Sequence, residues 1–155
     1  MAKKIAWGGI DPGLSGCACL LTTDKIWFHD FISEEKASAI LDQWQHEFRV
    51  KFLLEKQVDV RKPGFNVKGK LLINYGFWRG CLYSYNCNFV TLTAQQWQKV
   101  MPGKRQKSET TKDRALMYAI KYYPAASGML DKKKDHNRAD ALLMAHYLRQ
   151  IEIGG

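Results

Sequence analysis

The sequence predicts an α/β fold in which a mixed five-stranded sheet is flanked by helices. Short apolar segments bounded by Gly, Pro, Asn and Asp predict strands, and apolar residues at spacings of three and four predict helices. The strands come first as a meander and then alternate with helices, as in a mixed sheet. At 155 residues the chain has the length of one domain, so we expect a single domain over residues 1–155.

The predicted strands differ in how they are bounded. The first ends at Asp11-Pro12-Gly13, where proline fixes the turn and glycine supplies unusual backbone angles. The second and third form an antiparallel meander around Thr23-Asp24. The fourth is an apolar run that ends at Glu55, and we expect it to lie parallel to the first because a helix precedes it. The five strands are residues 5–10, 17–22, 25–31, 50–54 and 88–92.

Helices are predicted from apolar spacing and from capping residues. Ser33 is the expected N-cap of the first helix, Ser108 and Thr111 are rival N-caps of the third, and Asn137 is the expected N-cap of the last. A short helical turn is expected after Thr93. The four helices are residues 33–48, 67–85, 108–122 and 137–151, with a basic loop at 102–107 and irregular structure at 124–134.

Positive charge is concentrated in the middle of the chain. The net charge is +9, and residues 60–108 contain nine Lys and Arg but no Asp or Glu. Such a stretch predicts a polyanionic partner, although each residue taken alone is as readily part of a solvated face. The candidate phosphate contacts fall into two groups by position in the sequence: Lys99, Lys104, Arg105 and Lys107 in one, and Arg61, Lys62, Lys68 and Lys70 in the other.

The four cysteines lack the paired spacing of a zinc site, and no secretory leader or long apolar span is present. We therefore expect Cys17, Cys19, Cys81 and Cys87 to be reduced, and the protein to be soluble, cytoplasmic and not membrane-bound.

Two acidic residues follow strands that are predicted to be neighbours. Asp11 ends the first strand and Glu55 ends the fourth, and the carboxyl ends of strands are where α/β sheets place catalytic groups. Asp11 alone is more readily explained by a Pro-Gly turn. Two adjacent carboxylates repel each other, so the pair predicts a bound cation or a shared proton.

A third acid lies at the start of the last helix. Asp140 there is also explained by the helix dipole, which favours an acid in the first turn. Asp135 and His136 precede the helix, and either is able to fold back beside Asp140. Carboxylates that converge from two strand ends and one helix start would hold two Mg²⁺ ions, which cleave phosphodiesters by in-line displacement.

Apolar residues follow Glu55 in a polar segment. Val58, Val60 and Phe65 are candidates for a wedge that inserts between bases, with core packing as the alternative.

The chain resembles the RuvC-type Holliday junction resolvases, and within them the bacteriophage and organellar branch. The resemblance covers most of the chain and rests on the order and spacing of five short motifs. They are Ile10-Asp11-Pro12-Gly13, Leu53-Leu54-Glu55-Lys56, Tyr75-Gly76-Phe77-Trp78-Arg79-Gly80, Thr91-Leu92-Thr93-Ala94-Gln95-Gln96-Trp97-Gln98-Lys99 and Arg138-Ala139-Asp140-Ala141-Leu142.

The resemblance implies a ribonuclease H-like fold and a homodimer, which would use the apolar face of the 67–85 helix. It implies Mg²⁺- or Mn²⁺-dependent nicking of two opposed strands of a four-way junction, with Asp11, Glu55 and Asp140 as catalytic carboxylates. The family's fourth ligand is an Asp or His three residues before the last Asp, and here that position is Asn137. Asp135 or His136 is expected to replace it, with Asp135 favoured by its charge.

Other functions fit parts of this pattern. They are a junction-binding module without nuclease activity, a nuclease for other branched DNA or for RNA–DNA hybrids, a transposase-like strand cutter, and an actin-like phosphotransferase, for which the chain is too short. The resemblance also allows a protein encoded by a phage or acting in an organelle.

Overall fold

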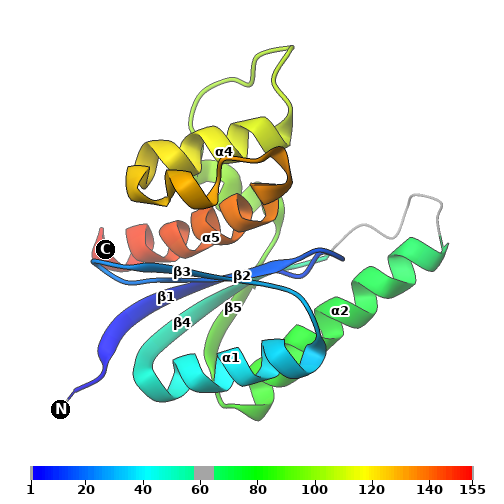
Figure 1. Cartoon of the computed structure of the whole chain (residues 1–155), viewed down its shortest axis with the longest axis vertical. Coiled ribbons are helices and arrows are strands. Elements are labelled where there is room, and N and C mark those ends of the chain that lie inside the picture. Colours follow the sequence, from blue (N-terminus) through cyan, green and yellow to red (C-terminus); the bar gives the residue numbers. More distant parts are fainter. Residues whose placement is uncertain (1, 58–64, 155) are drawn as a thin grey trace.

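A computed structural model describes residues 2–57 and 65–154, and its centre is one mixed sheet (Figure 1). The strand order is β3-β2-β1-β4-β5, with β1 antiparallel to β2, β2 antiparallel to β3, and both β1/β4 and β4/β5 parallel. The sequence prediction of a mixed five-stranded sheet is therefore confirmed. The strands are β1 Lys4–Asp11, β2 Cys17–Leu21, β3 Ile26–Asp30, β4 Phe48–Glu55 and β5 Asn88–Leu92.

One face of the sheet is covered by α1 (Glu34–Glu47) and α2 (Phe65–Ser84) (Figure 1). Side chains that alternate along β1 and β4 point to this face, among them Ile10 and Leu54. Trp78 of α2 packs in the same core and is fully buried. The α1 helix begins after Ser33, whose side chain accepts a hydrogen bond from the Lys36 backbone N–H, as the sequence predicted.

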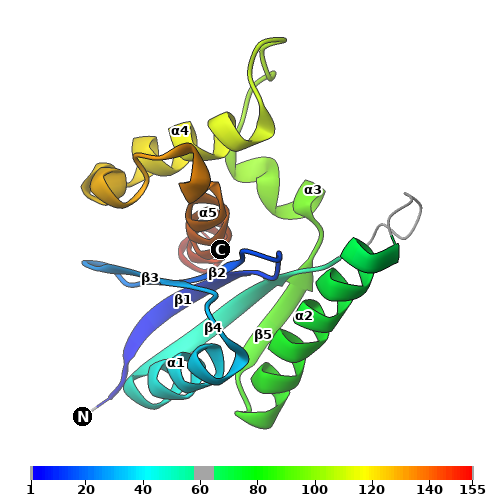
Figure 2. The ribbon, with the colours of Figure 1, turned by 45° about the vertical axis from the view of Figure 1, so that its right-hand side comes forward.

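The opposite face is covered by α5 (His136–Ile153), which packs on β1 and β2, and α4 lies on α5 rather than on the sheet (Figures 1 and 2). Every residue from Ala141 to Ala145 is buried, as expected for a helix between the sheet and another helix. The remaining elements are α3 Ala94–Trp97, η1 Gln98–Val100, α4 Thr111–Tyr122, η2 Pro124–Met129 and η3 Lys133–Asp135.

Gly9 permits an unusually close approach of α5 to β1. A Cβ atom on Gly9 would lie 1.9 Å from the carbonyl oxygen of Ala141, far inside any allowed contact. Gly9 is two residues from Asp11, and Ala141 is next to Asp140. The glycine therefore sets the separation between the strand that carries one acid and the helix that carries another.

Two helix starts differ from the sequence predictions. The N-cap of α4 is Thr110, whose hydroxyl accepts from the Asp113 backbone N–H, and neither Ser108 nor Thr111 has that role. The last helix begins at His136, so Asn137 lies inside it and is not its N-cap. The Asn137 side chain instead donates to the carbonyl of Ser15. Because Ser15 is remote in sequence, the residues around Asn137 do not indicate this partner, and the N-cap prediction was wrong.

All four cysteines are free, with Cys17, Cys19 and Cys87 buried and Cys81 partly buried. Within residues 2–57 and 65–154, no helix combines the length and apolar character needed to span a bilayer.

Candidate active site

Asp11 and Glu55 lie side by side at the carboxyl edge of the sheet. Ile10 pairs with Leu54 in the parallel register, so the residues that follow them end adjacent strands at the same level. Because Ile10 and Leu54 point toward α1 and α2, alternation directs the next side chains to the α5 face. Both acids are partly buried there.

Asp140 reaches the same place from the second turn of α5. Burial raises its pKa well above the usual carboxyl value, and the charges of Asp11 and Glu55 raise it further. The three carboxylates therefore lie close enough for their charges to interact. This is the convergence of two strand ends and one helix that the sequence predicted.

The pKa of Glu55 is raised to about 7, first by burial and then by the charge of Asp11. Hydrogen bonds from Trp97 and Gln57 act in the opposite direction; the indole Nε1 of Trp97 donates to Glu55 Oε2 at 2.8 Å. Since Trp97 is fully buried, the indole fixes this oxygen. Near neutral pH Glu55 is thus poised between its protonated and ionised forms.

The pKa of Asp11 is also raised by burial, against a hydrogen bond from the Gly13 backbone N–H and the charge of His136. That N–H donates to Asp11 Oδ1 at 3.0 Å. The turn itself is held by Asn74 of α2, whose buried amide donates to the carbonyls of Pro12 and Gly13 at 3.2 and 2.8 Å. The Asp-Pro-Gly turn therefore also positions the Asp11 carboxylate.

This group of side chains fits divalent cations in chemistry and in charge. Carboxylate oxygens are the ligands that Mg²⁺ prefers, and a cation between them would relieve the repulsion that adds to burial in raising the pKa values of Glu55 and Asp140. As they are placed in the described residues, no three His, Cys, Asp or Glu side chains already form a coordination cluster. The carboxylates therefore have to turn toward one another to share an ion.

The three candidates for a fourth ligand are placed differently. Asp135 is buried, and its Oδ2 accepts the backbone N–H of Lys132 at 3.1 Å in the turn before α5. His136 is partly buried and acts on Asp11 through its charge. The side-chain amide nitrogen of Asn137 donates a hydrogen bond to the carbonyl of Ser15. Of the three, His136 is the residue with an electrostatic effect on the carboxylate group.

The basic candidates lie on segments that also carry residues in contact with the carboxylate site, Trp97 and Asn74. Lys99 is exposed in η1, two residues after Trp97, while Lys104, Arg105 and Lys107 are exposed in the loop between η1 and α4. Lys68 and Lys70 are in the first turns of α2, on the helix whose Asn74 holds the Asp11 turn. Arg61, Lys62, Val58 and Val60 lie outside the described residues, as does the side chain of Phe65.

Three contributors to the site are missing from the sequence prediction. They are Trp97 and Asn74, with the hydrogen bonds described above, and Lys112 in the first turn of α4, whose charge lowers the pKa of Asp140. No local pattern marks these residues, because each role depends on a partner far away in sequence. Trp97 lies within one of the five motifs of the resemblance, from Thr91 to Lys99, but that motif does not indicate its bond to Glu55.

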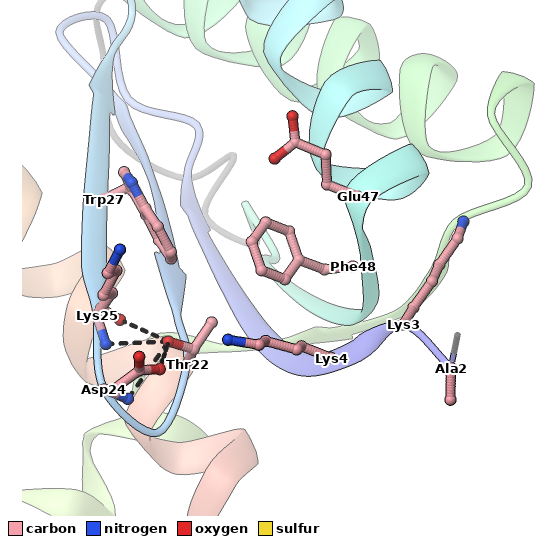
Figure 3. Close-up of a pocket in the computed structure, with 9 residues that line it drawn as sticks. All are labelled: Ala2, Lys3, Lys4, Thr22, Asp24, Lys25, Trp27, Glu47 and Phe48. Atoms are coloured by element: carbon pink, nitrogen blue, oxygen red, sulfur yellow. Dashed lines mark hydrogen bonds between the residues drawn. The ribbon is translucent and has the colours of Figure 1, made fainter.

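A pocket with a different chemistry lies at the other end of the strands, where β1 begins. Figure 3 shows Trp27 and Phe48 between Lys4, Lys25 and the acid Glu47. Its volume is 510 Å³, and the hydroxyl of Thr22 organises the adjacent turn by hydrogen bonds to Asp24 and Lys25. Because β1 runs about 23 Å from this end to Asp11, at ~3.3 Å per residue, the pocket is separate from the carboxylates.

Comparison with known proteins identifies similar folds. T. thermophilus RuvC in complex with a Holliday junction substrate matches with a TM-score of 0.63 and 15% identity over 97% of this chain and 96% of that chain. A second Thermus thermophilus RuvC structure matches with a TM-score of 0.61 and 17% identity over 96% of each chain. No family model and no curated protein matches the sequence. The chain therefore has the ribonuclease H-like α/β fold that RuvC has, as the sequence predicted.

Proposed function

We propose that this protein is a metal-dependent endonuclease that resolves four-way DNA junctions by paired, symmetric nicks. The observation that carries the proposal is the convergence of Asp11, Glu55 and Asp140: in addition to burial, the charge of Asp11 raises the pKa of Glu55, and the charges of both raise the pKa of Asp140. Their position at the carboxyl edge of a RuvC-like sheet supports junction DNA as substrate, since one matching RuvC structure is a complex with a Holliday junction.

Asp11, Glu55 and Asp140 would hold two Mg²⁺ ions, for which Mn²⁺ is a substitute. When bound, the ions would supply an activated water and stabilise the charge on the leaving oxygen. Asp11 is oriented by the Gly13 N–H, and one oxygen of Glu55 by the Trp97 indole. Because carboxylates bind metal in the ionised form, metal binding should release a proton from Glu55 near pH 7.

The fourth ligand is proposed from the same placement. Asp135 has the better charge for Mg²⁺, but its Oδ2 accepts a hydrogen bond from the Lys132 backbone. We infer that His136 is better placed, because it lies close enough to Asp11 to act on it, and its Nδ1 contacts the Lys133 carbonyl, which leaves Nε2 of the neutral imidazole for a metal ion. His136→Ala should weaken Mn²⁺ binding by about tenfold or more, whereas Asp135→Asn should change it by about twofold or less. Isothermal titration with Mn²⁺ and no DNA compares the two variants, and the opposite ranking would restore Asp135.

Substrate contacts are proposed for the basic residues around the carboxylates. The residues that would bind phosphates near the cut are Lys99, Lys104, Arg105 and Lys107. Lys112 lies close enough to Asp140 for its charge to lower the pKa of that carboxyl. Lys68 and Lys70 would bind an adjacent arm, together with Arg61 and Lys62. Phosphate contacts of this kind release counterions, so junction affinity should fall steeply with salt.

A homodimer is proposed to bring one active site to each of two opposed strands. On the solvent side of α2, Leu72, Ile73 and Tyr83 are 52%, 67% and 61% exposed. Gly76 and Gly80 have open space in front of them, which would let a second α2 approach closely. Ile73→Glu should give a monomer in light scattering while retaining the fold, and a wild-type monomer under cleaving conditions would contradict the dimer. The bacteriophage and organellar branch remains a prediction from the sequence motifs.

The test of function is a panel of labelled substrates with Mg²⁺: a four-way junction, a duplex, a flap and an RNA–DNA hybrid of matched sequence. The proposal predicts paired nicks in the junction and little cutting of the duplex. Preference for the hybrid would make the protein a ribonuclease H. Tight junction binding in EDTA without nicking in Mg²⁺ would make it a binding module.

A further inference from the structure

The loop between η1 and α4 carries three of the proposed DNA contacts and has a buried anchor. Residues 102–108 are exposed, and they include Lys104, Arg105 and Lys107. Figures 1 and 2 show this loop projecting away from the helices that bear it. A projecting basic loop binds DNA more tightly when its conformation is fixed before binding, because ordering it on the DNA costs affinity.

Arg114, in α4, is the side chain at the base of this loop. It is 9% exposed, and its Nη2 donates to the carbonyls of Met101, Pro102 and Gly103 at 2.8, 3.1 and 2.8 Å. Its Nη1 donates to Glu109 Oε2 at 3.3 Å in an ion pair that is mostly shielded from solvent. One guanidinium thus connects the start of the loop with its end.

Two tyrosines of α4 support the same anchor. The Tyr118 ring lies under the Arg114 guanidinium, 5.2 Å from its central carbon, and its hydroxyl donates to the carbonyl of Pro102. The Tyr122 hydroxyl donates to the carbonyl of Val100, just before the loop. Three side chains on successive turns of α4 therefore hold four consecutive carbonyls, from Val100 to Gly103.

The anchored segment leads directly to the carboxylates on both sides. Before it, Trp97 holds Glu55; after it, Lys112 acts on Asp140. Within it, Gly103 has a φ of +92°, a conformation that glycine adopts without strain. The carbonyls that precede and include Gly103 are fixed by Arg114, so the direction in which the loop leaves the protein is fixed as well.

We propose that Arg114 is a positioning residue for substrate: it holds the 102–108 loop in its DNA-binding conformation and does not itself contact DNA. This inference rests on the proposed function, because it assigns a role in junction binding. Arginine is required chemically, since its planar fork donates in several fixed directions while lysine has one ammonium group. Arg114→Lys should keep part of the anchor, and Arg114→Gln should lose most of it.

The experiment measures junction binding by fluorescence anisotropy without metal, and steady-state nicking with Mg²⁺. Arg114→Gln should weaken binding and raise KM by about tenfold, with kcat changed by about twofold or less, because the loop contributes binding energy alone. Arg114→Lys should lie between Arg114→Gln and wild type. Arg49→Gln, an exposed arginine at the other end of β4, is the matched control and should bind as wild type does.

A second background separates positioning from general destabilisation. In a chain with Lys104, Arg105 and Lys107 all changed to Gln, adding Arg114→Lys should cost no further affinity, because the loop has no charges left to position. The proposal would be overturned if Arg114→Lys weakened junction binding as much in that background as in wild type. A fall in kcat with KM unaltered would overturn it as well. Hydrogen exchange of the Met101 and Glu109 amides, which donate to the carbonyls of Gln98 and Gln106 at the two ends of the anchored segment, should accelerate in Arg114→Lys, and unchanged exchange would overturn the proposal even if wild type fails to bind junctions.

Discussion

The Trp97 indole Nε1 lies 2.8 Å from Glu55 Oε2, and this hydrogen bond opposes the burial and charge that raise the pKa of Glu55 to about 7. The donor comes from the short helix after β5 and the acceptor from the end of β4. A core tryptophan thereby favours the ionised form of a proposed metal ligand.

Trp97→Phe should shift the acid limb of the pH–rate profile to higher pH. A hydrogen bond to a charged group is worth about 1.5–3 kcal/mol, which corresponds to a shift of about one to two pH units. Activity should fall at pH 7 and recover toward pH 9, as more Glu55 ionises. The control is Trp7→Phe, which removes an indole bond to Glu152 near the C-terminus of α5, whereas Asp140 lies near the start of that helix. An unshifted profile would show that the Trp97 hydrogen bond does not set the Glu55 pKa.

Glu55→Gln should change how the stability of the metal-free protein depends on pH. The folded pKa of Glu55 lies above its ordinary value of 4.5, so ionised Glu55 destabilises the fold. Wild type should lose about 3 kcal/mol relative to Glu55→Gln as pH rises from about 4.5 to about 7, and no more above that range. Urea unfolding at several pH values, with EDTA present, measures this difference. A difference that stays constant across that range would mean that Glu55 has an ordinary pKa.

Gly9→Ala should push α5 away from β1, because the added Cβ meets the Ala141 carbonyl at 1.9 Å. We expect a loss of about 1–3 kcal/mol in the free energy of unfolding, as for other overpacked cores. Nicking should fall more than stability explains, since Asp140 moves relative to Asp11. Gly128→Ala is the control, because open space surrounds that position. Full activity in a folded Gly9→Ala protein would contradict the proposed dependence on this close contact.

Asn74→Ala should loosen the turn that carries Asp11. The buried amide of Asn74 donates to the carbonyls of Pro12 and Gly13, and their loss should cost about 1–3 kcal/mol of stability. Metal affinity should fall with it, because Asp11 would no longer be held by a fixed turn. Mn²⁺ titration and chemical denaturation measure the two effects. Asn74→Asp, which keeps the size but replaces the donor with an acceptor, should be no better than Ala.

The sequence predicted the sheet and the meeting of the three acids for physical reasons. Strand ends and parallel connections follow from apolar runs and from chain topology, so the adjacency of Asp11 and Glu55 could be derived. Asp140 followed from a helix that had to cover the sheet. These features follow from the periodic spacing of apolar residues in strands and helices.

The features that escaped prediction depend on partners remote in sequence. Asn137 was expected to cap the last helix, but its side chain bonds to Ser15, and the helix begins one residue earlier. Arg114 shows no local signal, because its role arises only when α4 folds back onto the preceding loop. Local propensity cannot report such contacts, since a competing tertiary partner decides them.

The most direct test compares wild type with Asp11→Asn on one end-labelled four-way junction. Wild type with Mg²⁺ should nick two opposed strands at symmetric positions, and Asp11→Asn should bind the junction with the same affinity in EDTA yet leave it intact in Mg²⁺. Nicking by Asp11→Asn at the wild-type rate would contradict the central claim that these carboxylates perform the cleavage.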